Sequence, residues 1–243
     1  MIALILAAGQ GTRLRPITEN APKAMTHLFG KSLIDYQIEI FKILGFSKII
    51  IVGGYMSNKL PACGVSVIVN NNFETTNMVY SLFCAKNILL QSKEDVVVSY
   101  GDIVFEKQVL EKLINSDNDY SVVSDQGWEA LWRNRMDHYL NDVETFLTDS
   151  DDYIVSLGKR PKSLSEVGGQ FIGLLKIKKN KLQEFFSVKG KLTSNKEFNR
   201  LFMTDYIQEM INLGVKVKSI YIKNGWLEVD TVQDLNSYIH LKE

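Results

Sequence analysis

Residues 6–16 of the chain are Leu6-Ala7-Ala8-Gly9-Gln10-Gly11-Thr12-Arg13-Leu14-Arg15-Pro16, and Pro22-Lys23 follows shortly after. The apolar run from Ile2 to Ala7 predicts a buried strand that ends where the glycines begin. Gly9 and Gly11 allow the backbone to approach a ligand closely, so successive loop N–H groups can bind an anion. Arg13 and Lys23 add a planar guanidinium and a mobile ammonium. Together these features predict a site for a nucleoside triphosphate.

Neither common phosphate motif fits this stretch, because Gly-x-x-x-x-Gly-Lys-Ser/Thr is absent and Gly9-x-Gly11 lacks the third glycine of the dinucleotide fingerprint. The stretch from Leu6 to Lys23 instead resembles, without a gap, the signature of the nucleotidyltransferases that make activated sugars and activated alcohol phosphates. In that signature Gly-x-Gly-Thr-Arg-Leu-x-Pro is followed by Pro-Lys. The resemblance implies that Arg13 stabilises the leaving pyrophosphate and that Lys23 bridges the α-phosphate and the acceptor. It also implies nucleotide contacts at Leu6, Ala7, Ala8, Gly9, Gly11, Thr12 and Arg13. A glycine turn with solvated basic residues is the simpler alternative, and the length of the match disfavours it.

The composition indicates the class of protein and the kinds of partner that it can bind. A chain of 243 residues with 45% hydrophobic and 23% charged residues suits one globular α/β domain. Because 28 basic residues balance 28 acidic ones, we expect no general attraction to nucleic acid or to an anionic membrane. Cys63 and Cys84 form no close-spaced pair, and the apolar start is too short for an anchor and lacks the basic residues of a signal peptide. We therefore expect a cytoplasmic protein, and the choice between a monomer and a homo-oligomer stays open.

Strand and helix patterns alternate along the first half and predict a three-layer, Rossmann-like α/β fold whose mixed sheet is mainly parallel. Strands are expected at 48–52, 65–69, 96–100 and 120–123, with helices at 34–44, 79–90 and 109–114. The second half predicts a hairpin of 143–147 with 153–157, a strand at 170–177, helices at 179–188 and 201–213, a strand at 215–222 and a closing helix at 232–241. No linker divides the chain. We expect one nucleotidyltransferase domain over 1–243, with a nucleotide-binding half to about residue 125 and an acceptor-binding half from about residue 126.

Two carboxylates from distant segments are candidate metal ligands. Ligands of parallel sheets bind beyond the carboxyl ends of the strands, where Gly9, Gly101 and Asp102 are expected. Asp230 lies in Leu227-Glu228-Val229-Asp230-Thr231, just before the closing helix. The resemblance implies that Asp102 and Asp230 hold a catalytic Mg²⁺, since the family uses a strand-end Asp and a late Asp in a Val-Asp-Thr-like context, and it implies that Gly101 contacts the nucleotide. The alternatives are a turn residue for Asp102 and a helix N-cap for Asp230.

The segment from Asn72 to Leu82 indicates which nucleotide is used. It resembles the Asn- and Thr-rich segment of cytidylyltransferases that act on phosphocholine and aminoethylphosphonate, except that Met78 replaces an Asn. The resemblance implies CTP as the donor, with nucleotide contacts from Asn72, Thr76, Asn77 and Ser81. The alternative for Thr76 or Asn77 is the N-cap of a helix.

The acceptor site is the least family-like part of the chain. Trp128 and Trp132 are four residues apart, which places them on one helix face, where they form either an aromatic wall for a quaternary ammonium or part of the core. Arg133 and Arg135 favour a carboxylate or phosphate instead, and so an acceptor with an amine and an anionic group. The expected acceptor-binding residues are Lys23, Trp128, Trp132, Arg133, Lys159 and Glu166. Lys159 is included because Ser156-Leu157-Gly158-Lys159 resembles a family element; the alternative is a solvated lysine after a strand. Glu166 is included because the stretch from Glu166 to Gly173 resembles another family element; the alternative is that its glycines mark a strand bulge.

The expected function is a Mg²⁺-dependent cytidylyltransferase that transfers CMP from CTP to a small phosphorylated acceptor and releases pyrophosphate. The acceptor is like phosphocholine, like aminoethylphosphonate, or an amino-acid or glutamine phosphate, and the product would serve modification of a cell-surface glycan or capsule. The alternatives are a sugar-1-phosphate nucleotidyltransferase using UTP, dTTP or GTP, and a nucleotide-sensing homologue without turnover. Retention of Arg13, Lys23, Asp102 and Asp230 together argues against the last.

Overall fold

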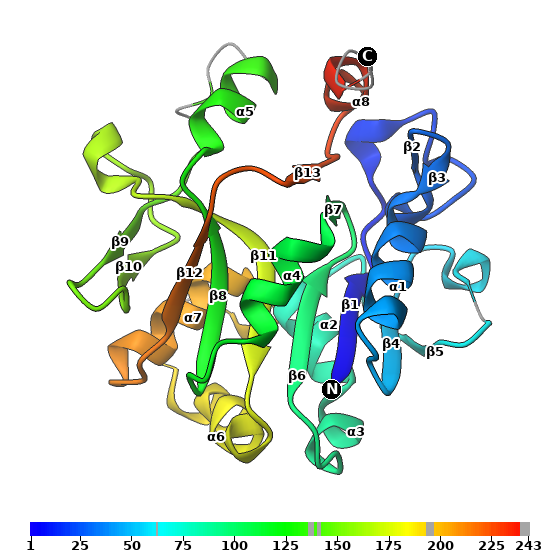
Figure 1. The fold of residues 1–243 in the computed structure, drawn as a ribbon. Helices are drawn as coiled ribbons and strands as arrows, with labels where there is room; N and C mark the ends of the chain where they lie inside the picture. The colour runs from blue at the N-terminus through cyan, green and yellow to red at the C-terminus, as the bar shows by residue number, and fades with distance from the viewer. Residues whose placement is uncertain (62, 136–138, 140–141, 193–196, 239–243) are drawn as a thin grey trace.

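The computed structural model describes residues 1–61, 63–135, 139, 142–192 and 197–238. A sheet of seven strands in the order β12-β8-β11-β6-β1-β4-β5 crosses the molecule, with helices on both faces (Figure 1). Neighbouring strands are parallel except at β11, which is antiparallel to β6 and to β8. The predicted mixed, mainly parallel sheet is therefore confirmed. Its strands are β1 (Ile2–Ala7), β4 (Lys48–Gly53), β5 (Ser66–Val69), β6 (Val96–Tyr100), β8 (Tyr120–Asp125), β11 (Gln170–Ile177) and β12 (Lys218–Ile222).

Strand β1 is buried along its whole length because alternate side chains enter two different cores. Ile2, Leu4 and Leu6 pack in the core under α2 (Met78–Cys84), α3 (Lys86–Leu90), α6 (Leu182–Ser187) and α7 (Met203–Asn212). Ala3, Ile5 and Ala7 pack in the core under α1 (Leu33–Ile43), α4 (Lys107–Ile114) and α5 (Trp128–Arg135). Among the described residues no helix combines the length and the apolar character needed to cross a bilayer. The two cores hold β1 at the centre of the sheet, so the loop that follows it is fixed at the sheet's carboxyl edge.

Several short strands lie outside the main sheet. β9 (Phe146–Thr148) and β10 (Ile154–Leu157) form an antiparallel pair within the predicted hairpin, and β2 (His27–Leu28) pairs with β3 (Lys31–Ser32). β7 (Ile103–Phe105) follows β6 directly and pairs with β13 (Trp226–Glu228), which precedes α8 (Val232–Tyr238). The sequence patterns do not predict the β7–β13 pair. It matters for the site because it joins the segment after β6 to the segment before α8.

Candidate active site

A cavity of about 270 Å³ opens at the carboxyl ends of β1 and β6. The loop after β1 forms one wall and the start of α2 forms another. Gly101 also lines the cavity, against the end of β1, where a Cβ would come within 2.8 Å of the Leu6 carbonyl oxygen, so only glycine fits the backbone there. The cavity is lined by Leu6, Ala7, Ala8, Gly9, Gly11, Thr12, Arg13, Lys23, Ala24, Phe73, Thr76, Asn77, Met78, Ser81, Tyr100, Gly101, Asp102 and Asp230. All the residues expected from the stretch between Leu6 and Lys23 therefore line one cavity, and Ala24, Phe73, Met78 and Tyr100 are lining residues that the sequence argument missed.

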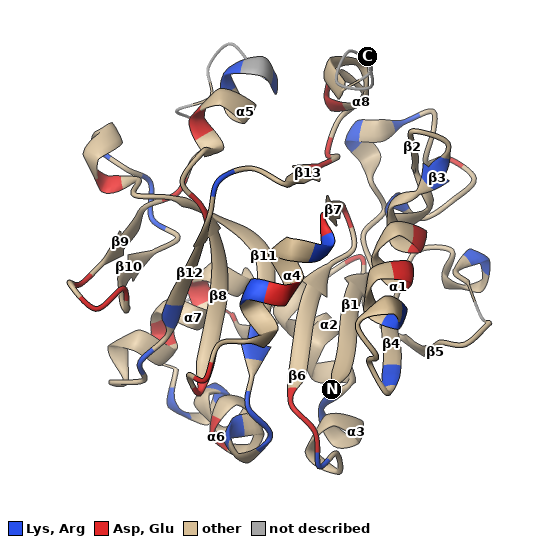
Figure 2. Ribbon diagram, viewed as in Figure 1, with Lys and Arg blue, Asp and Glu red and all other residues tan. Residues whose placement is uncertain are grey.

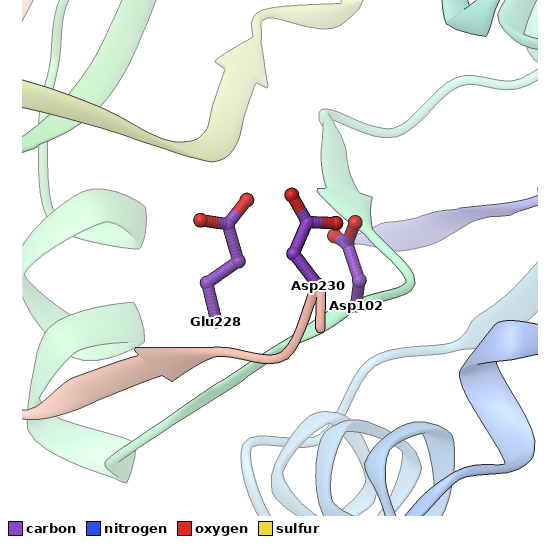
Figure 3. Close-up of side chains that lie close together, drawn as sticks. All are labelled: Asp102, Glu228 and Asp230. Atoms are coloured by element: carbon purple, nitrogen blue, oxygen red, sulfur yellow. The ribbon is translucent and has the colours of Figure 1, made fainter. Parts of the chain in front are cut away.

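Three carboxylates meet at one side of this cavity. Ligand oxygens of Asp102, Glu228 and Asp230 all lie within 4.8 Å of one another, and the side chains point to a shared region (Figure 3). The β7–β13 pair brings them together: Ile103 is in register with Glu228, and the Val229 N–H donates to the Asp102 carbonyl at 3.0 Å. Glu228 is a member of the cluster that the sequence argument missed, because its place depends on this pairing of distant segments.

Two cationic side chains form ion pairs with these carboxylates. Lys23 Nζ donates to Asp102 Oδ2 at 2.5 Å and also donates to Asp230 Oδ1. Arg13 Nη2 donates to Asp230 Oδ2 at 2.8 Å. In Figure 2 the basic loop after β1 lies beside the acidic segment between β13 and α8. The four residues expected to carry the chemistry, Arg13, Lys23, Asp102 and Asp230, are thus in direct contact.

The packing of these charges shifts their proton affinities. Burial alone would lower the pKa of Lys23, but the Asp102 and Asp230 carboxylates outweigh burial and hold that pKa above its usual value. Lys23 likewise holds the pKa of Asp230 below its usual value, although burial acts in the opposite direction. Burial raises the pKa of Glu228 to about 7, with Asp230 and Asp102 adding to the effect and Arg135 opposing it. The site therefore favours the anionic form of Asp230, whereas it disfavours the anionic form of Glu228.

The cluster fits a hard divalent cation. Asp102 Oδ1 is buried and has no hydrogen-bond partner among the described residues. An unpartnered buried carboxylate oxygen is costly, and a metal ion beside it would remove that cost. Carboxylate oxygens are the ligands that Mg²⁺ favours, together with water and phosphate. The simpler role considered for Asp230, capping the last helix, belongs to Thr231, whose Oγ1 accepts the Asp234 N–H at 3.1 Å.

The segment before α2 is organised by Asn70, which the sequence argument also missed. Asn70 is 1% exposed and its Nδ2 donates to Thr76 Oγ1 and to Ser81 Oγ, each at 3.0 Å. Asn77 is the N-cap of α2, as one alternative predicted, and it lines the cavity as well. Asn72, expected to contact the nucleotide, lies outside the lining of the cavity, and its Nδ2 donates to the Tyr80 hydroxyl at 2.9 Å. A polar residue directly after a strand was the signal that could have revealed Asn70.

The tryptophans of α5 are core residues, which corrects the expected aromatic wall. Trp128 and Trp132 are each 5% exposed and pack edge to face with ring centroids 6.1 Å apart. Trp132 also lies against Trp226 of β13 at 6.0 Å. Arg133 is exposed and its Nη2 donates to Glu129 one turn earlier at 2.6 Å. Trp128, Trp132 and Arg133 do not line the cavity.

Lys159 and Glu166 also lie outside the cavity. Lys159 belongs to a second hollow of about 340 Å³, lined by Leu157, Gly158, Lys159, Arg160, Asp205, Gln208 and Glu209. Glu166 accepts the Lys162 N–H at 2.7 Å. Lys23 is thus the expected acceptor residue that the structure places in the main cavity.

Residues 3–150 match the family described as the MobA-like NTP transferase domain, and the chain belongs to that family. It is therefore a nucleotidyltransferase by fold and by sequence. Among solved structures, the inositol-1-phosphate CTP transferase from T. maritima has a TM-score of 0.78 at 22% identity, over 99% of this chain and 93% of its own. The CTP:phosphocholine cytidylyltransferase from Streptococcus pneumoniae has a TM-score of 0.72 at 23% identity, over 100% and 99%. These two structures share the fold of this chain.

Similarity to named relatives indicates the kind of nucleotidyltransferase to which the chain is related. The CTP:phosphoglutamine cytidylyltransferase of Campylobacter jejuni is 36% identical, over 98% of this chain and 99% of its own length. The choline-phosphate cytidylyltransferase of Streptococcus pneumoniae is 30% identical, over 96% and 95%. The chain therefore belongs with the cytidylyltransferases, and the resemblance drawn from its motifs is confirmed.

Proposed function

We propose that this protein is a Mg²⁺-dependent cytidylyltransferase that transfers CMP from CTP to a small phosphorylated acceptor and releases pyrophosphate. The observation that carries the proposal is the contact of Lys23 with both Asp102 and Asp230 at the wall of the cavity after β1. There, beside a glycine-rich loop, the protein holds cationic side chains that can bind phosphates and carboxylates that can bind a metal ion. The similarity to two named cytidylyltransferases supports CTP as the donor.

The reaction is a displacement at phosphorus. An oxygen of the acceptor phosphate attacks the α-phosphorus of CTP in line, a new P–O bond forms, and the bond from the α-phosphorus to the bridging oxygen breaks. Pyrophosphate leaves with the electron pair, and the product carries a CDP group. No protein nucleophile is needed, so catalysis consists of positioning and charge neutralisation.

Each charged residue has a role in this scheme. Arg13 is 65% exposed at its side chain and close to the loop glycines, so it can turn to the leaving pyrophosphate. Lys23 can exchange its carboxylate partners for an α-phosphate oxygen and the acceptor phosphate. Asp102 and Asp230 would hold Mg²⁺, with Glu228 beside them. When bound, the ion would neutralise charge on the phosphate oxygens.

The cytosine would lie at the α2 side of the cavity. Thr76, Asn77 and Ser81 offer hydroxyl and amide groups there, and Ala8 offers backbone groups. A pyrimidine is small enough to be distinguished by such groups through hydrogen bonds. Asn70 bonds two of these hydroxyls, so their contacts to a bound base would be preorganised.

The acceptor we propose carries an amino group and an anionic group besides its phosphate, as a phosphorylated amino acid derivative such as glutamine phosphate does. Quaternary ammonium groups are held by aromatic faces, and the two tryptophans considered for that role are core residues. The greater identity to the relative named for phosphoglutamine than to the relative named for choline phosphate points the same way. The CDP-linked product is an activated donor, and we propose that the step that consumes it transfers the phosphorylated group to a cell-surface glycan.

Isotope position tests the proposal. With CTP labelled with ³²P at the α-phosphorus, the label should appear in an organic product; with label at the γ-phosphorus, it should appear in pyrophosphate. Both transfers should require Mg²⁺ and an acceptor. Release of γ-label as inorganic phosphate, without pyrophosphate, would mean hydrolysis and would overturn the proposal.

A further inference from the structure

The structure assigns Arg135 as a positioning residue for the carboxylate cluster, an inference that rests on the proposed function of that cluster. Its side chain is 1% exposed, and its guanidinium is bonded to two carboxylates of the segment that carries Asp230. From the sequence, Arg135 was a candidate to bind an anionic group of the acceptor. In the structure it contacts neither the cavity nor the pair of Lys23 with Asp102.

One arm of Arg135 fixes the backbone at Asp230. Its Nε donates to Asp234 Oδ1 at 2.9 Å and its Nη2 donates to Asp234 Oδ2 at 3.3 Å, which is a two-point fork. The same Asp234 Oδ2 accepts the backbone N–H groups of Asp230 and Thr231, each at 2.8 Å. The guanidinium therefore orients the carboxylate that holds the main chain of Asp230 in place.

The other arm fixes Glu228. Arg135 Nη1 donates to Glu228 Oε2 at 2.8 Å, so the third carboxylate of the cluster is held from behind. A lysine in this place would keep the charge but would lack the planar fork that reaches both Glu228 and Asp234. Replacing Arg135 with lysine therefore separates the effect of its positive charge from the effect of its hydrogen-bonding geometry.

Trp132 of α5 packs against this guanidinium and helps to orient it. The guanidinium carbon of Arg135 lies 4.9 Å from the ring centroid of Trp132, and Trp132 packs against Trp226 of β13. Helix α5 and strand β13 are therefore joined by an aromatic contact and by the arginine bonds. Through this contact α5, none of whose described side chains lines the cavity, can set the geometry of the metal-binding segment.

Arg135→Lys tests the inference, with Arg133→Lys as the matched control two residues away on the same helix. Outer-shell partners of metal ligands typically contribute about 10- to 100-fold, so Arg135→Lys should lower kcat and the affinity for Mn²⁺ by about tenfold or more. Mn²⁺ binding is followed by electron paramagnetic resonance without nucleotide, a readout that does not depend on turnover. The KM for CTP should change little, because the loop after β1 and the α2 side bind the nucleotide. Arg133→Lys should match the wild type in all three quantities.

A second variant covers the case in which lysine impairs folding. Arg135→Ala should regain part of its kcat and Mn²⁺ affinity in millimolar guanidinium, and not in equal concentrations of methylammonium or sodium. A purely structural role predicts a lower melting temperature with normal kcat and Mn²⁺ affinity below that temperature, and this result would overturn the inference. Loss of Mn²⁺ affinity in Arg135→Lys with an inactive wild type would instead overturn the proposed function and leave the positioning role supported.

Discussion

Lys23 Nζ lies 2.5 Å from Asp102 Oδ2 and also contacts Asp230, so its ammonium occupies the space between the two carboxylates proposed as metal ligands. The lysine is thus the counter-ion of these two carboxylates. A divalent ion held by the same two carboxylates would compete with the lysine, because both cations draw on the same pair of negative charges. Phosphate groups offer the displaced ammonium new anionic partners, so binding of metal and binding of nucleotide should be coupled.

Replacing the lysine should reveal this competition. Lys23→Met removes the ammonium, and two unit charges about 4 Å apart near a protein surface interact by about 4 kcal/mol before screening and relaxation. We expect Mn²⁺ to bind the nucleotide-free variant at least about tenfold more tightly than the wild type, while turnover is lost. Titration followed by electron paramagnetic resonance measures the affinity. Unchanged or weaker binding would show that the lysine and the metal do not share a position.

The paired carboxylates should act as a unit. Asp102→Asn and Asp230→Asn should each lower kcat by about 10²-fold or more, because each removes a preorganised charge at the reacting phosphates. The double variant should be little worse than either single variant, since the effects of residues that act together are not additive. Steady-state pyrophosphate release gives these values, and circular dichroism checks the fold. Near-normal activity of Asp230→Asn would remove Asp230 from the site.

Asn70 should matter for nucleotide binding although it does not line the cavity. Asn70→Ala leaves the buried hydroxyl of Ser81 and the half-buried hydroxyl of Thr76 without the donor that Asn70 Nδ2 supplies, which costs about 1–3 kcal/mol of folding stability. The KM for CTP should rise because the base contacts lose their fixed orientation. Asn72→Ala, two residues away and outside the cavity, serves as the control and should leave that KM unchanged. Thermal melts with and without CTP measure both effects; equal CTP shifts in Asn70→Ala and wild type would contradict the assignment.

Trp128 should affect stability and not acceptor binding. Truncating a buried tryptophan typically costs about 3–5 kcal/mol, so Trp128→Ala should lower the free energy of unfolding by that order. Urea titration measures the loss. The KM for the acceptor, measured well below the melting temperature, should stay at the wild-type value. A raised acceptor KM in a fully folded variant would restore the aromatic wall that the burial of this residue argues against.

The sequence predicted those parts of the site that depend on local order. The run from Leu6 to Lys23 is continuous in the chain, and its loop, Arg13 and Lys23 meet in one cavity. Asp102 was found because it follows a strand neighbouring β1 in a parallel sheet, where strand ends meet. Glu228 was missed because its place depends on two three-residue strands that pair although they lie about half the chain apart in sequence.

Residues with two physical roles were the other source of error. Trp128 and Trp132 share a helix face whether that face covers a ligand or a core, and only packing against Trp226 decides between the two. Arg135 has the charge of an acceptor-binding residue, and its burial against Asp234 and Glu228 could not be seen in the chain. Periodicity predicts that a face is apolar; it does not predict what covers that face.

Pyrophosphate release is the measurement that tests the central claim most directly. CTP, UTP, dTTP and GTP are each paired with glutamine phosphate, phosphocholine, aminoethylphosphonate and glucose 1-phosphate, with Mg²⁺ and with EDTA. We expect release with CTP and Mg²⁺, greatest with glutamine phosphate, and none with EDTA. Release with UTP, dTTP or GTP and the sugar phosphate, without release from CTP, would contradict the account.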